Sequence, residues 1–79
     1  MRAEGSRKMQ YTAAYFKNGK AVGIPITASN VGEAVAALFE HRQRIISDTT
    51  EEEARHTLLL NADGLIIRTV DVISGSVSE

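Results

Sequence analysis

The chain has 79 residues, a formal net charge of −1 and no cysteine. A chain of this length forms one domain and buries only about 60% of its unfolded surface, and its near-neutral charge argues against a dedicated nucleic-acid binder. The lack of cysteine excludes a disulfide framework, a thiol nucleophile and a thiolate metal site and fits a reducing cytoplasm, while no apolar run approaches the roughly 20 residues of a membrane span.

Residues 9–17 and 20–28 are predicted to form a β-hairpin. Apolar and polar residues alternate along both segments, as in half-buried strands. Asn18-Gly19 between them is a preferred sequence for a two-residue type I′ turn, and such a turn brings the apolar sides of both strands onto one face. Because Pro25 cannot donate to a strand ladder, the second strand is expected at the edge of the sheet.

The other face of this hairpin is predicted to be flat, small and weakly apolar. It carries Thr12, Ala14, Phe16, Ala21, Gly23 and Pro25. A smooth face beside an edge strand is a candidate docking surface. The alternative is a solvated sheet face with one exposed phenylalanine.

A helix is predicted from Val31 to about Ser47. Asn30 is a favoured N-cap residue, and Glu33 three residues later completes a capping box. The apolar stripe of this helix is interrupted near its centre by Arg42. Either the arginine extends along the edge of the core and pairs with a carboxylate, or it projects with the neighbouring histidine toward a partner. The candidate carboxylates are Asp48, Glu51, Glu52, Glu53 and Asp71.

Residues 48–56 have the character of a turn followed by one or two helical turns. Thr50 and Glu53 form a second capping box, and acidic residues suit a helix N-terminus. The three consecutive glutamates at 51–53 are either the solvated start of this helix or an acidic contact patch.

Residues 57–60 and 65–73 are predicted to form a second hairpin around Asp63-Gly64. The second segment is rich in β-branched residues, which favour strands, and the Asp-Gly pair favours a two-residue turn. Such a turn places four apolar residues on one face, namely Leu58, Leu60, Leu65 and Ile67.

These elements predict an α+β fold in which two hairpins form a four-stranded, mainly antiparallel sheet, with one long helix and a short helical turn between them. Residues 9–73 form the single domain, and flexible tails are expected over residues 1–8 and 74–79. The predicted core consists of Tyr11, Tyr15, Val22, Ile24, Ile26, Val31, Val35, Leu38, Phe39, Ile45, Leu58, Leu60 and Ile67.

The sequence contains no recognisable catalytic constellation. Its two histidines, His41 and His56, match no zinc-binding spacing, and its glycines are scattered rather than gathered into a phosphate loop. The glutamate run has no predicted pocket that would raise a pKa. We therefore expect a protein that is not an enzyme and that needs neither a metal nor another cofactor.

In a pattern of small phage and prophage proteins, a strand ends in V-x-A-x-s and a Glu-Ala pair opens the following helix. This pattern resembles the segment Ile24-Pro25-Ile26-Thr27-Ala28-Ser29-Asn30 with Glu33-Ala34, and the resemblance covers about 20 residues. Small anti-CRISPR inhibitors include α+β chains of this size. The resemblance implies a non-enzymatic inhibitor that binds a CRISPR effector subunit in the cytoplasm of a bacterial host and blocks access to target DNA. The hairpin before a helix is also similar to compact antitoxin domains, whose glycine-rich strand is missing here.

Three functions are compatible with these residues, and the least favoured is a structural or assembly subunit that forms a homo-oligomer through the edge at Pro25 and the face that carries Phe16. The first is a protein-binding inhibitor or adaptor, a monomer or homodimer that contacts neither membranes nor nucleic acid directly. Its candidate binding residues are Phe16, Lys17, Lys20, His41, Arg42, Arg44, Glu51, Glu52 and Glu53. The alternative is a nucleic-acid-associated regulator that uses the basic residues of this set. Residues 1–47 hold seven basic and three acidic residues (net +4), and residues 48–79 hold two basic and seven acidic residues (net −5), a split that can orient a partner.

Overall fold

The sheet has five antiparallel strands in the order β2-β1-β3-β4-β5, and three helices are present among residues 7–79, which the computed structural model describes. Its elements are β1 (Met9–Lys17), β2 (Lys20–Ala28), α1 (Val31–Glu40), α2 (Arg42–Asp48), α3 (Glu51–Ala54), β3 (Thr57–Leu60), β4 (Ile66–Asp71) and β5 (Ser76–Ser78). The α+β class is confirmed, and the expected four strands and one long helix match only roughly. The expected tail at residues 1–8 lies outside the described residues except for residues 7 and 8.

The first hairpin has the predicted register, with Lys17 opposite Lys20 at the turn. Asn18 and Gly19 adopt φ angles of 55° and 81°, as a type I′ turn requires. β2 lies at the edge of the sheet, as its proline predicted. Because hydrogen-bonded and non-hydrogen-bonded pairs alternate from the turn onward, Pro25 falls in a non-hydrogen-bonded pair with Thr12. Its missing N–H is therefore on the free edge, and no ladder bond is lost.

The predicted long helix is two helices, because the chain turns at His41. The capping box at the start of α1 is present: the Asn30 side chain accepts the Glu33 N–H at 2.9 Å, and the Glu33 carboxylate accepts the Ser29 N–H at 2.9 Å. At the break, the His41 N–H donates to the Leu38 carbonyl three residues back, at 3.0 Å, which tightens the last turn. Neither glycine nor proline marks this position, so the break has no local sequence signal.

The β3–β4 connection is not the predicted two-residue turn. Residues 61–65 form a five-residue loop, closed by the Asn61 N–H donating to the Leu65 carbonyl at 2.9 Å. The Asn61 side chain also accepts the N–H groups of Asp63 and Leu65, at 2.9 and 3.0 Å. This side chain satisfies the loop backbone, and Gly64, at φ 82°, supplies the left-handed residue within it.

Pairing with β1 decides which leucines of β3 are buried, because Leu59 lies opposite the fully buried Ala13. Leu59 is fully buried beneath the helices, whereas Leu58 and Leu60 lie on the opposite face and are only half-buried. The prediction that Leu58 and Leu60 belong to the core is therefore wrong. The buried core consists of Tyr11, Ala13, Tyr15, Ile24, Ile26, Ala28, Ala34, Leu38, Ile45, Ala54, Leu59, Val70 and Val72. Packed against it are the half-buried Val22, Val31, Val35, Ala37, Phe39, Ile46, Ile67 and Ile73.

The segment expected as a frayed tail contains β5, which pairs Val77 with Val70. The connecting turn is held by Asp71: its carboxylate accepts the N–H groups of Ile73 and Ser74 at 2.9 and 3.0 Å, and its carbonyl accepts the Gly75 N–H at 2.7 Å. The last long strand therefore ends at Asp71 rather than at residue 73. Asp71, followed by polar residues and Gly75, was the sequence signal for this turn. The polar composition of the segment, which is also typical of a frayed tail, obscured it.

We predict that Leu59→Ala lowers the free energy of unfolding by about 2–5 kcal/mol, because it opens a cavity in a fully buried site. Leu60→Ala, one residue along on the opposite face, should cost roughly 1 kcal/mol. Urea denaturation of both variants measures the difference, and a larger loss for Leu60→Ala would contradict the observed placement of β3.

Candidate functional site

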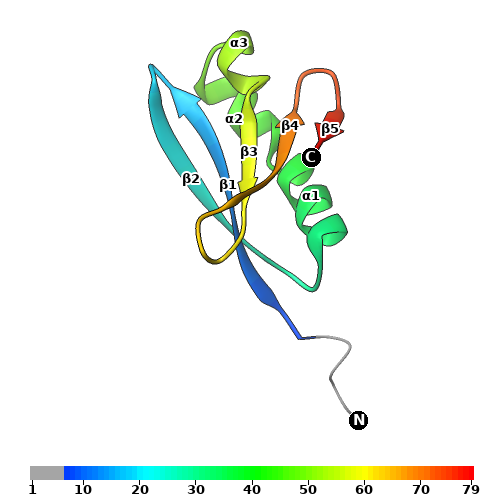
Figure 1. The fold of residues 1–79 in the computed structure, drawn as a ribbon. Helices are drawn as coiled ribbons and strands as arrows, with labels where there is room; N and C mark the ends of the chain where they lie inside the picture. The colour runs from blue at the N-terminus through cyan, green and yellow to red at the C-terminus, as the bar shows by residue number, and fades with distance from the viewer. Residues whose placement is uncertain (1–6) are drawn as a thin grey trace.

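The helices cover one face of the sheet and leave the other without a covering element in residues 7–79 (Figure 1). Strand register assigns residues of all five strands to this uncovered face, because paired residues point to the same side and neighbours alternate. We call ten of them, which form its central part, the open face: Thr12, Ala14, Phe16, Ala21, Gly23, Pro25, Leu58, Leu60, Ile66 and Thr69. None of these ten carries a charge, and the charged Asp71 of β4 lies at their border on the same side as Thr69.

An apolar stripe crosses the open face over three neighbouring strands. Ala14 of β1 pairs with Leu58 of β3, and Leu60 pairs with Ile66 of β4. The Ile66 side chain is 60% exposed, and the two leucines are half-buried without belonging to the core cluster on the other face. Contiguous exposed apolar surface of this kind marks interaction sites. The open face is therefore the candidate binding surface of the molecule.

The β2 side of the open face is flattened by small residues. A Cβ atom placed on Gly23 would meet the Thr12 methyl carbon at 3.2 Å, so a larger residue would press against its neighbour. Ala21 and Pro25 flank this glycine on the same face and are exposed. The predicted docking face thus exists, and it extends further, onto β3 and β4, than the first hairpin alone indicated.

The predicted binding residue Lys17 is engaged within the protein. Its ammonium group lies 2.9 Å from Asp48 Oδ1, and the Tyr15 hydroxyl donates to the other oxygen of the same carboxylate. The Tyr15 hydrogen bond, and then that of Lys17, hold the pKa of Asp48 below its ordinary value. The bond to Asp48, followed by burial, raises the pKa of Tyr15. These contacts fasten β1 to the end of α2.

The predicted binding residue Glu53 holds the hairpin turn against α3. Its carboxylate accepts the Gly19 N–H at 2.9 Å and the Asn18 N–H at 3.4 Å. The Thr49 hydroxyl lies 2.8 Å from the Glu53 carboxylate and 2.6 Å from the Phe16 carbonyl, and it has one proton to share between the two acceptors. Hydrogen bonding from Gly19, and then from Thr49, lowers the pKa of Glu53.

Arg42 contacts the backbone rather than a carboxylate. Its Nε donates to the carbonyl of Val72, just beyond the end of β4, and its side chain is half-buried. The expectation of a carboxylate partner for Arg42 is wrong, because its guanidinium is directed at this backbone carbonyl. Glu51 and Asp71 both bind Arg55, at 3.1 and 3.3 Å. The arginine that interrupts the apolar stripe therefore ties the helices to the far strands.

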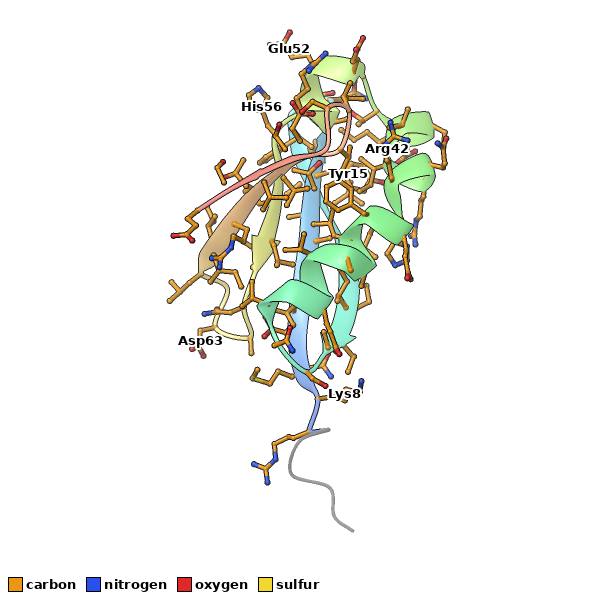
Figure 2. All side chains as sticks on the ribbon, turned by 90° about the vertical axis from the view of Figure 1, so that its right-hand side faces the viewer. Lys8, Tyr15, Arg42, Glu52, His56 and Asp63 are labelled. Carbon is orange, nitrogen blue, oxygen red and sulfur yellow. The ribbon has the colours of Figure 1, made fainter. Side chains whose placement is uncertain are left out.

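The remaining predicted binding residues lie on three separate elements at the same end of the domain. Lys20 starts β2, Arg44 lies in α2 and Glu52 in α3, all of them exposed, while His41 is half-buried at the helix break. Figure 2 shows Arg42 and Glu52 at this end, and Lys8 and Asp63 at the other. The structure thus brings the charged candidates to one end, where Lys17, Arg42, Glu51 and Glu53 are bonded to other residues of the chain. The open face contains only one of the predicted residues, Phe16.

The residues that sequence reasoning missed are Leu58, Leu60 and Ile66. Three consecutive leucines make both faces of β3 apolar, and this run was a signal that a second apolar surface existed. Alternation alone could not reveal which face carried one leucine and which carried two.

Two hollows lie beside the ten residues of the open face. One, of about 360 Å³, is lined by Met9, Gln10, Tyr11, Asn61, Ala62 and Asp63, and the other, of about 260 Å³, lies beside the Glu53 cluster. In the part of the chain that the structure describes, no group of three or more His, Cys, Asp or Glu residues could hold a metal ion. Over the same residues, no helix is long and apolar enough to cross a membrane.

Comparison with family models, with curated protein sequences and with solved structures found no match for this chain. Its function is therefore inferred from the open face and from the internal bonds of the charged end.

We predict that acid weakens the charged end through Asp48 and Glu53. Both pKa values are lowered in the folded protein, so their stabilisation is complete above the ordinary values near 4 and is lost as the pH falls toward the lowered ones. Glu53→Gln should flatten the dependence of the unfolding free energy on pH between 3 and 6, measured by urea denaturation. Glu52→Gln, on the exposed next position, is the control; an equal flattening in both variants would contradict the assignment.

We predict that Arg42→Met lowers the free energy of unfolding by about 1–2 kcal/mol, because it keeps the apolar stem and removes the donor to Val72. Arg44→Met is the matched control, since Arg44 is exposed and should change stability by about 0.5 kcal/mol or less. Thermal and urea unfolding of the pair measure the difference. Equal stability of the two variants would show that Arg42 has no fastening role.

Proposed function

We propose that the protein is a small non-enzymatic, protein-binding inhibitor or adaptor that contacts its partner through the open face. The observation that carries this proposal is an apolar stripe across β1, β3 and β4, with the half-buried Leu58 and Leu60 and the exposed Ile66, on the uncharged central part of the uncovered face. Interface centres are depleted in charged residues and enriched in apolar and aromatic ones. Phe16 at the end of the stripe supplies the aromatic anchor.

The charges of the molecule favour a protein partner over a nucleic acid. Nucleic-acid binding needs several cations positioned for phosphates, and the open face has none. At the charged end, Lys17 is neutralised by Asp48, and Arg42 is turned toward Val72. The remaining exposed cations there, Lys20 and Arg44, share this end with the acidic helix α3. A regulator that binds nucleic acid is therefore the weaker alternative.

The anti-CRISPR resemblance stays a prediction, and it specifies one kind of partner for this surface. A CRISPR effector subunit would be bound by contact with the open face, and target DNA would be blocked by the bulk of the domain. Imitation of DNA by the whole surface fits poorly with a net charge of −1.

The test is a pull-down from nuclease-treated bacterial lysate with the wild-type chain and two variants. Ile66→Glu places a charge on the open face at a position that is 60% exposed, so the fold should persist. Ala36→Glu places the same charge on the exposed side of α1 as the matched control. We expect the wild type and Ala36→Glu to recover the same partner protein in stoichiometric amounts. Ile66→Glu should recover at least tenfold less of this protein.

Equal recovery by Ile66→Glu and Ala36→Glu would show that the partner binds elsewhere. Recovery that disappears on nuclease treatment, and that falls steeply with salt, would favour the nucleic-acid alternative. A purified CRISPR effector subunit, tested with the same three proteins, addresses the anti-CRISPR prediction separately.

A further inference from the structure

We propose that Asn18-Gly19 is a site of spontaneous deamidation, and that the Glu53 carboxylate protects it by holding the attacking nitrogen in the folded protein. The inference does not depend on what the open face binds. It rests on the sequence of the β1–β2 turn, on the backbone geometry of this turn and on its hydrogen bonds with α3, which lies at the same end of the domain (Figure 1).

Deamidation uses groups that the turn itself carries, together with water. The Gly19 backbone nitrogen loses its proton and attacks the side-chain carbonyl carbon of Asn18. The new carbon–nitrogen bond closes a five-membered succinimide ring, and the side-chain nitrogen takes up a proton and leaves as ammonia. Water then breaks one of the two bonds between a ring carbonyl carbon and the ring nitrogen, which gives aspartate or isoaspartate at position 18. No oxidant or reductant takes part.

Asn18 is better suited to this reaction than the other two asparagines of the sequence, Asn30 and Asn61. It lies in an exposed turn, and Gly19 has no side chain to obstruct the approach of the backbone nitrogen. The other two are each followed by a residue that has a Cβ atom. Their side chains also accept backbone N–H groups, in the cap of α1 and in the β3–β4 loop. They therefore serve as references within the same chain.

The folded turn keeps the two reacting atoms apart. Ring closure requires the Gly19 nitrogen and the Asn18 Cβ to lie on the same side of the Asn18 Cα–C bond. The φ angles of Asn18 and Gly19, 55° and 81°, are those of a type I′ turn, in which ψ of the first central residue is about +30°. At that angle the nitrogen lies nearly opposite Cβ across the bond. Attack therefore requires the turn to open.

Glu53 restrains the attacking nitrogen a second time. Its carboxylate accepts the Gly19 N–H at 2.9 Å and the Asn18 N–H at 3.4 Å. Hydrogen bonding from Gly19 lowers the pKa of Glu53, so the acceptor is charged at neutral pH. Loss of the Gly19 proton would place a negative nitrogen next to this carboxylate, and like charges so close repel each other. The reaction therefore needs the turn to separate from α3.

Deamidation weakens the junction between the first hairpin and α3. Isoaspartate adds a methylene group to the backbone, which the two-residue turn between Lys17 and Lys20 cannot accommodate without distortion. Aspartate keeps the backbone length but adds a carboxylate close to Glu53, to which the backbone nitrogen of position 18 already donates. Because the released ammonia does not return, the modified fraction grows with the age of the protein, at a rate set by opening of the turn.

Peptide mass spectrometry of the full chain after incubation at pH 8 and 37 °C measures this conversion. We expect Asn18 to be converted at least tenfold more slowly in the folded wild type than in the wild type unfolded by guanidinium chloride. Asn30 and Asn61 should stay largely intact in the folded chain. Equal rates at Asn18 in the folded and unfolded chains would overturn the proposal, because the turn would then give no protection.

Four variants test the role of Glu53. Glu53→Ala should accelerate conversion at Asn18 at least threefold, because it removes the acceptor, and Glu53→Gln, which keeps the shape of the side chain, should accelerate it less. Glu52→Ala, at the exposed next position, is the matched control and should leave the rate unchanged. Ile45→Val weakens the buried core away from the turn and should also leave the rate unchanged, because exposed turns open locally without global unfolding.

Far-UV circular dichroism checks that each variant is folded, and if Glu53→Ala is not, Glu53→Gln carries the comparison. Equal rates in the folded Glu53 variants and in Glu52→Ala would overturn the role of Glu53. Equal acceleration in Ile45→Val would assign the reaction to global unfolding and would also overturn it. Deamidated wild type, separated by anion exchange, should unfold at a lower urea concentration than the intact chain. An unchanged midpoint would overturn the proposed weakening of the junction.

Discussion

The register of β3 is the constraint on which the rest of the structure depends. β3 lies between β1 and β4, so its placement fixes which side chains of all three strands face the helices. Leu59 pairs with Ala13 and points into the core, and Leu58 and Leu60 consequently point to the open face. A slip by one residue would exchange the two faces. Because three leucines in a row give almost the same burial in either placement, the register must be set outside the strand. The pairing with β1 sets it, since Leu59 lies opposite the buried Ala13, and the Asn61 side chain closes the loop that follows the register shift after Leu59.

The charged end is the second set of contacts that holds the domain together. Asp48 and Glu53 sit where the β1–β2 turn meets α2 and α3, and each accepts hydrogen bonds from that hairpin. Arg42 and Arg55 make the corresponding connections from the helices to the last strands. A short chain with a small core gains order from such bonds because they fix how separate elements meet. The same bonds reduce what these residues can offer to a partner.

How much could be predicted from the sequence depends on whether each signal was local. The Asn18-Gly19 turn, the register of the first hairpin and the caps at Asn30 and Thr50 were predicted because neighbouring residues determine them. The break at His41 and the extent of β5 depend on contacts with distant elements. The candidate binding surface was likewise predicted only in part. Its half on the first hairpin was predicted from alternation. Its half on β3 and β4 was missed because Leu58 and Leu60 were correctly placed on one face but that face was assigned to the core, and only the pairing of Leu59 with Ala13 in β1 shows otherwise.

The arrangement of charge and apolar surface, taken with the size of the open face, defines the kind of binding the domain can support. Its charges are largely satisfied inside one end, and an uncharged apolar stripe is left on the sheet. Under the proposed function, such a surface would select partners by shape and by the exclusion of water rather than by charge. A partner that covered the stripe alone would bury little area, so a tight complex would need contacts that extend beyond it, onto the exposed residues of β2 or the rim of β4.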